Sequence, residues 1–168
     1  NVVPLIPRYL RLTVDERVDA QGNILTPFDE SELIPIIEFL KAEAVESVAV
    51  CYMNAFKNSS HEEQTVKYLR ANLPDCFITA STEVLPSIRF YERVSTTAVN
   101  AYIGPVVANY LGNLTDKLDE INFNGTLLIM QSNGGVVTPD VVRTSPAVTV
   151  LSGPAAAPTA GVFYANMI

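Results

Sequence analysis

The sequence predicts an α/β fold in which mixed or parallel sheet layers are flanked by helices. Two short apolar runs, "SVAVCYM" (residues 47–53) and "CFITAS" (76–81), have the continuous hydrophobic character of strands that are covered on both faces. One amphipathic helical pattern precedes the first run and another separates the two runs. This alternation of strand and helix is typical of parallel strands joined by crossover helices.

The N-terminal part predicts a strand, a turn and a helix. Residues 8–18 alternate between apolar and polar side chains, which predicts a half-exposed strand. "DAQGN" (19–23) then predicts a turn around Gly22. We expect a helix next, with Asp29 as its N-cap and Glu32 three residues later, although Pro35 lies early in it. Its apolar stripe comprises Leu33, Ile36, Ile37, Leu40 and Ala44.

The next helical pattern, "SSHEEQTVKYLRANLP" (59–74), opens with a predicted capping box. The Ser60 hydroxyl would accept a hydrogen bond from the amide of Glu63, whose carboxylate would reach back. Pro74 would end this helix. His61 is the only histidine. We expect it to be a solvated residue of the first turn, because it has no obvious acid–base partner.

The second half predicts one long helix and two more strands. The helix would run from about residue 89 to about 120, kinked or split at Gly104-Pro105. "GTLLIM" (125–130) and "AVTVLSG" (147–153) are predicted strands, and "GPAAAPTAGVFYANMI" (153–168) is a small-residue helix, regular only after Pro158. The apolar residues of the long helix recur every four positions: Tyr102, Val106, Tyr110, Leu114 and Leu118. We expect two parts, a small α/β lobe over residues 1–88 and a second part over 89–168.

Composition narrows the classes of partner. Eleven basic residues against eighteen acidic ones give a net charge of −7, and no basic run occurs, which argues against nucleic acid and anionic membranes. No apolar stretch reaches the roughly 18 residues that a membrane span needs. Cys51 and Cys76 lie in strand-like runs and are interpreted as buried thiols of a cytoplasmic protein. One histidine and two cysteines without ligand spacing predict no metal site.

Two stretches remain as candidate binding sites, and each has an ordinary structural alternative. The first is "LLIMQSNGGV" (127–136), in which Asn133-Gly134 is a strong hairpin signal. The same residues follow an apolar strand in an α/β order, where loops at the carboxyl ends of strands bind ligands. The predicted binding residues are Gln131, Ser132, Asn133, Gly134 and Gly135.

The second candidate is "VLSGPAAA" (150–157), which predicts a strand running into a helix. The free amides at the helix start could hold an anion with help from the hydroxyl of Ser152, next to Gly153. The alternative is an ordinary serine N-cap with tight strand-to-helix packing. The sequence contains neither GxxxxGK[ST] nor GxGxxG, so it offers no self-contained phosphate-binding loop.

Four motifs together resemble the hydantoinase A / 5-oxoprolinase family, which also includes subunits of acetone and acetophenone carboxylases. They are "AVCYMNAFKNSSHEE", "EVLPSIRFYERVSTTAVNAYIGPVVANYL", "LLIMQSNGGV" and "TVLSGPAAA", in the family's order and spacing. The resemblance implies a partial actin-like ATPase (ribonuclease H-like) architecture. It implies an enzyme that uses ATP and Mg²⁺ to open cyclic amides such as hydantoin or 5-oxoproline, or to activate ketones for carboxylation. A companion hydantoinase B-like subunit is the implied partner.

The resemblance also predicts that these residues are a central fragment. Family members carry one glycine-rich phosphate loop at the extreme N-terminus and a second, resembling D-x-G-G-T-x-x-D, after an "SGPAGG"-like motif; neither occurs here. We therefore expect no ATP hydrolysis and no bound cofactor in residues 1–168 alone, with the rest of the polypeptide as partner. Ala156-Ala157 replaces the family's Gly-Gly, which weakens the anion-site interpretation of Ser152 and Gly153. A non-catalytic interaction module is the alternative.

Overall fold

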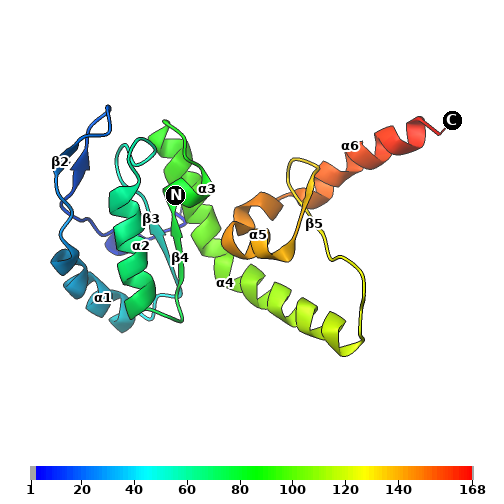
Figure 1. The fold of residues 1–168 in the computed structure, drawn as a ribbon, viewed down its shortest axis with the longest axis horizontal. Coiled ribbons are helices and arrows are strands. Elements are labelled where there is room, and N and C mark those ends of the chain that lie inside the picture. The colour runs from blue at the N-terminus through cyan, green and yellow to red at the C-terminus, as the bar shows by residue number, and fades with distance from the viewer. Residues whose placement is uncertain (1–2, 168) are drawn as a thin grey trace. The chain divides into compact units, whose positions relative to one another are not determined.

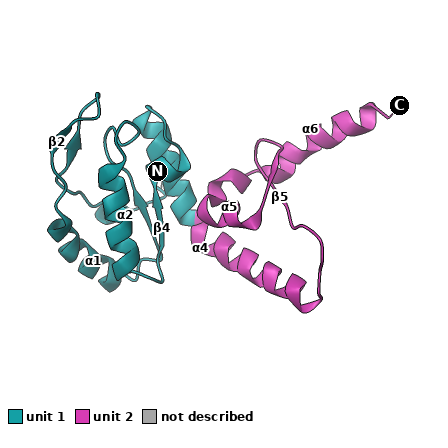
Figure 2. Cartoon of the chain, in the orientation of Figure 1, with its two compact units in different colours: residues 1–102 teal, residues 103–168 magenta. Residues whose placement is uncertain are grey.

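The computed structural model describes residues 3–167, which divide into two compact units (Figures 1 and 2). Unit 1 comprises residues 1–102 and unit 2 residues 103–168. The division falls inside one long helix, α4 (Phe90–Glu120). The predicted boundary between residues 88 and 89 stays a prediction. Within the described residues, no helix is both long and apolar enough to cross a membrane.

Unit 1 is built on the predicted β-α-β unit. Strands β3 (Ser47–Val50) and β4 (Phe77–Ala80) pair in parallel, with Val48 opposite Ile78, and helix α2 (Ser60–Asn72) connects them. Helix α1 (Leu33–Ala42) packs beside α2. The α/β class is confirmed. The core cluster joins the apolar stripes of both helices to the two strands: Leu33, Ile37, Leu40, Val50, Val66, Leu69, Leu73, Ile78 and Ala80.

The N-terminal segment departs from its prediction. Residues 8–18 do not form one strand: Arg8–Leu10 is a 3-10 helix, η1, and only β1 (Arg17–Val18) is a strand. Strand β1 pairs antiparallel with β2 (Ile24–Thr26) around the predicted turn, where Gly22 has a φ of +96°. Alternation alone was misleading because a strand also needs a partner ladder, and residues 11–16 have none in the described structure.

The helix starts differ from the predicted caps by a few residues. The Asp29 side chain accepts from the Ser31 amide at 2.8 Å and caps a 3-10 turn, η2 (Glu30–Glu32), ahead of α1. Helix α1 therefore begins at Leu33, and Pro35 lies in its first turn, where proline is tolerated. The N-cap of α2 is Ser59 rather than Ser60, and its hydroxyl donates to the Glu63 carboxylate. Ala44, which was predicted to belong to the apolar stripe of α1, lies beyond the end of that helix and has a φ of +49°.

Helix α3 (Ser81–Val84) follows β4, and α4 then runs without a break through Pro105. The predicted span of α4 is confirmed. Of the five apolar residues that recur every four positions along it, Leu114 and Leu118 are half-buried and the other three are exposed. Tyr102, Val106 and Tyr110 are more than 60% exposed. In unit 1 the buried face of α4 carries polar side chains instead: Arg93, Thr97 and Asn100. Apolar spacing alone therefore does not identify the buried face of α4.

Unit 2 begins within α4. Beyond that helix it contains a short hairpin, β5 (Ile129–Met130) and β6 (Val136–Val137), followed by α5 (Pro139–Thr144), the 3-10 helix η3 (Pro146–Thr149) and α6 (Ser152–Ala165). Of the predicted strand over residues 125–130, only Ile129 and Met130 form a strand. The predicted strand over 147–153 is wrong, because Pro146 starts η3 and Thr149 donates its hydroxyl back to the Pro146 carbonyl at 2.8 Å. Helix α6 contains Pro158 rather than starting after it.

Candidate functional site

Residues 131–135 form the turn of an antiparallel hairpin between β5 and β6. The hairpin alternative for the first candidate site is confirmed, but its turn is not the two-residue type I′ turn that Asn-Gly favours. Gly134 has a φ of +83°, whereas φ of Asn133 is not positive. The Gln131 amide donates to the Gly135 carbonyl at 2.8 Å and the Gly134 amide to the Gln131 carbonyl at 3.1 Å. The connection therefore spans five residues.

Ser132 anchors this loop to η3. Its amide donates to the Val148 carbonyl at 2.7 Å, and its hydroxyl lies within hydrogen-bond distance of the carbonyls of Val148 and Val150. Gly134 faces α6, because a Cβ at this position would stand 3.1 Å from Oγ1 of Thr159. The loop and the small-residue helix therefore lie side by side in unit 2.

The side chain of Asn133 is the group of this loop best placed to meet a ligand. Its Oδ1 accepts from the Gly135 amide at 2.8 Å, which leaves the Nδ2 donor for a partner outside the loop. Ser132, Asn133 and Gly135 are exposed, and Gln131 and Gly134 are half-buried. The amides of Gly134 and Gly135 are already used within the loop. A binding role for residues 131–135 stays a prediction.

The second candidate site, Ser152 and Gly153, is the first turn of α6. Ser152 is not the N-cap, so the ordinary-cap alternative is wrong: Leu151 holds that position in the left-handed conformation, with a φ of +62°. A Cβ on Gly153 would meet nothing within 4 Å, so packing in unit 2 does not require glycine here. Pro154 has no amide hydrogen, which leaves the amides of Ser152 and Gly153 as the donors at this helix start.

A polar cluster that sequence analysis missed lies at the carboxyl ends of β3 and β4 in unit 1. Glu62 on α2 is fully buried. Its Oε1 accepts from the Tyr52 amide at 2.8 Å and the Ser81 hydroxyl at 2.6 Å. Its Oε2 accepts from the amide and hydroxyl of Thr82, at 3.0 and 2.8 Å. One carboxyl group therefore joins the ends of both parallel strands.

Arg93 on α4 completes this cluster. It is 1% exposed, and its Nη2 donates to the Tyr52 carbonyl. Its guanidinium carbon lies 5.7 Å from the centre of the Phe56 ring and 5.5 Å from that of Phe90, within cation–π range. Nε and Nη1 of Arg93 have no hydrogen-bond partner among the described residues. The cluster thus contains the buried carboxyl group of Glu62 and the buried guanidinium group of Arg93, which form no ion pair with each other.

Burial at this strand end also changes two acidities. Burial raises the pKa of the Cys51 thiol to about 11, with the Thr97 hydrogen bond lowering it and the charge of Glu62 raising it. Burial likewise raises the pKa of Tyr52 to about 12, although its hydroxyl bonds to Thr65 at 3.0 Å. The neutral forms of both groups therefore persist to higher pH than in the unfolded chain.

The raised thiol pKa predicts a loss of stability at alkaline pH. In the unfolded chain Cys51 ionises near its ordinary pKa of 9.0, whereas in the folded chain it keeps its proton to about 11. Its contribution to stability is complete below pH 9 and is lost as pH rises from 9 to 11. Between pH 8.5 and 10.5, we expect wild type to lose about 2 kcal/mol more unfolding free energy than Cys51→Ala. Urea unfolding at both pH values measures this, and equal losses would contradict it.

His61 is not the solvated residue that the sequence predicts. It is 2% exposed, and its Nδ1 lies 2.8 Å from Oε2 of Glu16, which is 7% exposed. This contact joins the start of α2 to the residue before β1, 45 positions earlier. The Phe28 ring lies 6.1 Å from the imidazole. The pair therefore fixes the N-terminal segment to α2, as Glu62 fixes the two strand ends.

The sequence did contain one signal for the missed cluster. Glu62 lies four positions before Val66 and seven before Leu69, so it continues the buried stripe of α2 toward its start. Arg93, Thr97 and Asn100 recur at the same helical spacing on α4. Polar residues on a helix face that packs inward predict a buried hydrogen-bond network.

Comparison with known proteins places these motifs in one family. The hydantoinase/oxoprolinase N-terminal region model matches residues 2–73, and the hydantoinase/oxoprolinase model matches residues 93–167. Caprolactamase subunit alpha of Pseudomonas jessenii is 36% identical over 96% of the chain, and the acetophenone carboxylase gamma subunit of Aromatoleum aromaticum is 28% identical over 99%. The crystal structure of ATP-dependent caprolactamase from Pseudomonas jessenii superposes with a TM-score of 0.90, at 35% identity over 98% of the chain.

The chain spans about a quarter of the length of these relatives: 23% of both subunits and 24% of the crystallised caprolactamase. The two family models leave only a short gap, residues 74–92, which contains β4, and the structural match extends across that gap. The chain therefore belongs to the hydantoinase/oxoprolinase family.

Proposed function

We propose that residues 1–168 are a segment of an ATP-dependent enzyme that opens cyclic amides of the hydantoin, 5-oxoproline or lactam type. The observation that carries this proposal is the structural match to ATP-dependent caprolactamase over 98% of the chain. A caprolactam is a cyclic amide, the chemical class that the sequence resemblance predicts. A fragment of an ATP-dependent ketone carboxylase is the second candidate, supported by the similarity to an acetophenone carboxylase subunit.

In this proposal the chain contributes to two lobes of an actin-like ATPase. Mg-ATP would supply a phosphoryl group for the amide carbonyl oxygen, leaving ADP, and this would make the carbonyl carbon reactive toward water. Addition of water would then break the ring C–N bond and release phosphate. Asn133 Nδ2 and the amides at the start of α6 are hydrogen-bond donors suited to phosphate oxygens. The described residues contain no group of three or more His, Cys, Asp or Glu side chains that could hold a metal ion. In this proposal the magnesium ligands come from parts of the polypeptide outside residues 1–168.

Substrate-dependent ATP turnover tests the proposed function. The longer polypeptide that contains this chain, with its companion subunit, would be incubated with Mg-ATP and one of four additions: hydantoin, 5-oxoproline, caprolactam, or acetophenone with bicarbonate. We expect phosphate release to rise on addition of a cyclic amide, together with the ring-opened product. Stimulation by the ketone and bicarbonate alone would instead support the carboxylase. No stimulation by any of them would support the non-catalytic module.

Asn133 gives the proposal a residue-level test. Asn133→Asp keeps the Oδ acceptor that holds the Gly135 amide but replaces the Nδ2 donor with negative charge. We expect it to lower kcat/KM of the longer enzyme by about 100-fold or more, the cost of losing one donor to a developing anion. Asn124→Asp, in an exposed loop of the same unit, is the matched control and should leave kcat/KM unchanged. Equal activities of both variants would remove Asn133 from the site.

We also propose a cytoplasmic enzyme that works with a hydantoinase B-like subunit. The relatives support the idea of a partner, because caprolactamase alpha and acetophenone carboxylase gamma are named as subunits. Co-purification of the tagged longer polypeptide with a hydantoinase B-like protein would test the partner. Recovery of the tagged chain alone as an active enzyme would contradict it.

A further inference from the structure

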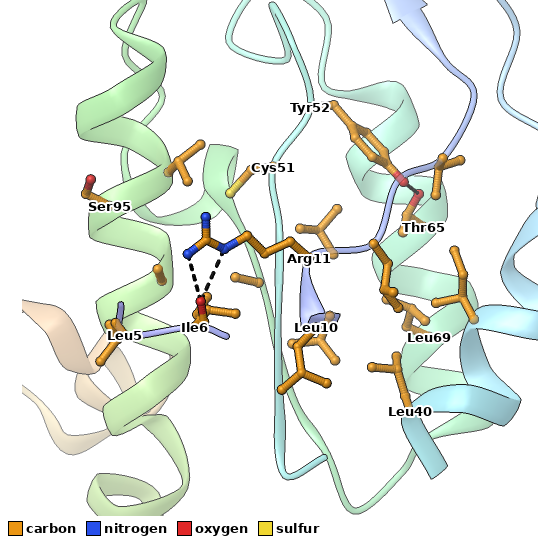
Figure 3. Close-up of a pocket in the computed structure, with 18 of the residues that line it drawn as sticks. Leu5, Ile6, Leu10, Arg11, Leu40, Cys51, Tyr52, Thr65, Leu69 and Ser95 are labelled. Atoms are coloured by element: carbon orange, nitrogen blue, oxygen red, sulfur yellow. Dashed lines mark hydrogen bonds between the residues drawn. The ribbon is translucent and has the colours of Figure 1, made fainter. Parts of the chain in front are cut away.

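A hollow of about 740 Å³ runs along one edge of β3 in unit 1 (Figure 3). Consecutive residues from Val48 to Tyr52 line it, and an adjoining hollow of about 350 Å³ continues past Ser47 to Glu43. Because side chains of a strand alternate between faces, an unbroken run of lining residues means that the strand edge itself faces the hollow. No residue of β4 lines either hollow. We call this the β3 edge groove.

The backbone of β3 has unpaired groups along this groove. The Phe77 amide donates to the Glu46 carbonyl at 2.9 Å, and Ser47 lies opposite Phe77. In a parallel ladder this places the N–H and C=O groups of Val48 and Val50 toward β4, and those of Ala49 and Cys51 toward the groove. Among the described residues, no hydrogen bond outside the β3–β4 ladder involves the main-chain groups of Ala49 or Cys51. Such an edge is a template for another strand.

The walls of the groove are apolar on both sides. Figure 3 shows α4 on one side, with Ser95, and the helices that carry Leu40 and Leu69 on the other. Arg11 is the one charged side chain among the residues lining the larger hollow, and its guanidinium already donates to the Ile6 carbonyl at 2.8 and 3.1 Å. The main apolar lining residues are Leu10, Leu33, Leu40, Leu69, Val94 and Ala98. An occupant therefore needs apolar side chains on both faces.

We propose that the β3 edge groove binds an apolar β-strand from the same polypeptide, outside residues 1–168, which extends the β3–β4 sheet along β3. Parallel sheets are normally covered on both faces and continue beyond two strands, yet three of the four β3 residues are only half-buried here. About three quarters of the length of the relatives lies outside the matched region, which is ample chain to supply the strand. A strand of about five residues, roughly 16 Å long, matches the edge from Ser47 to Cys51. The inference rests on the proposal that residues 1–168 are a segment of a longer polypeptide, but not on the reaction that this polypeptide catalyses.

Amide hydrogen exchange tests this strand directly. In the 168-residue chain we expect the amides of Ala49 and Cys51 to exchange rapidly, and those of Val48 and Val50 to be protected by β4. In the longer polypeptide, Ala49 and Cys51 should exchange at least about 100-fold more slowly, as hydrogen-bonded amides of a core strand do. Unchanged exchange at Ala49 and Cys51 in the longer polypeptide would overturn the proposal. Protection that appears in the 168-residue chain as its concentration rises would assign the groove to a second copy and would also overturn it.

Paired proline substitutions give an independent measurement. Proline is tolerated on a strand edge that has no partner but removes a ladder bond where a partner is present. In the 168-residue chain, Ala49→Pro should shift Tm by only a few degrees, whereas Val48→Pro, the matched control, should lower it by more than about 10 °C. In the longer polypeptide both should lower Tm by more than about 10 °C. A small effect of Ala49→Pro in both chains would contradict the strand.

Discussion

Glu62→Ala is expected to destabilise the 168-residue chain by about 3–5 kcal/mol, enough to unfold much of unit 1 at 37 °C. The side chain is fully buried, and its two oxygens accept four hydrogen bonds. Alanine would leave the half-buried amides of Tyr52 and Thr82 without partners at the ends of both parallel strands. Chemical denaturation followed by circular dichroism measures the loss.

Two variants of neighbouring chemistry serve as controls for Glu62. Glu63→Ala removes an exposed carboxylate from the same helical turn and should cost less than about 1 kcal/mol. Glu62→Gln keeps the size of the side chain and one acceptor oxygen, but its amide group would face hydrogen-bond donors. Its unfolding free energy should therefore lie between those of wild type and Glu62→Ala. If Glu62→Ala were no more destabilising than Glu63→Ala, the carboxyl group would not be what joins the two strand ends.

Glu16→Ala is expected to cost about 2–4 kcal/mol, because it leaves the buried imidazole of His61 without its partner. Replacing both residues with apolar ones removes the unsatisfied group, so Glu16→Leu combined with His61→Leu should be less destabilising than the sum of its single substitutions. Thermal unfolding of the two single variants and the double variant gives the coupling energy. We expect at least about 1 kcal/mol.

An exposed ion pair provides the comparison for Glu16 and His61. Arg89 lies just before α4 and Glu92 in its first turn. Nη1 of Arg89 is 3.5 Å from Oε1 of Glu92, and their side chains are 77% and 49% exposed. Glu92→Ala should change the unfolding free energy by less than about 0.5 kcal/mol, since solvent screens such pairs. Strictly additive losses for Glu16 and His61 would show that the 2.8 Å contact contributes nothing beyond burial of each residue.

The parts of the fold that the sequence predicted are those that local pattern determines. Residues 47–53 and 76–81 are mostly apolar and bracket an amphipathic helix, so local pattern was enough to predict the parallel β-α-β unit. The span of α4 was predicted for the same reason. Residues 8–18 and 147–153 were assigned to strands wrongly, because alternation and β-branched residues are necessary but not sufficient without a neighbouring strand.

The polar sites were less predictable because their partners are distant in sequence. Glu62 bonds residues 10 and 20 positions away, and His61 bonds Glu16 across 45. No local spacing rule joins such residues. The loop at 131–135 was identified from its Asn-Gly-Gly composition, but its five-residue geometry depends on Ser132 bonding to η3, a 3-10 helix that the sequence did not indicate.

Phosphate release from Mg-ATP by the purified 168-residue chain is the most direct test of the central claim, that these residues form one segment of a larger ATP-dependent enzyme. The chain has donors suited to phosphate at Asn133 and at the start of α6, but the described residues offer no metal-binding cluster and the sequence has no glycine-rich phosphate loop. We predict no release above background from the chain, and amide-stimulated release from the longer polypeptide measured in parallel. Turnover by the 168 residues alone, at the rate of the longer polypeptide, would contradict the account.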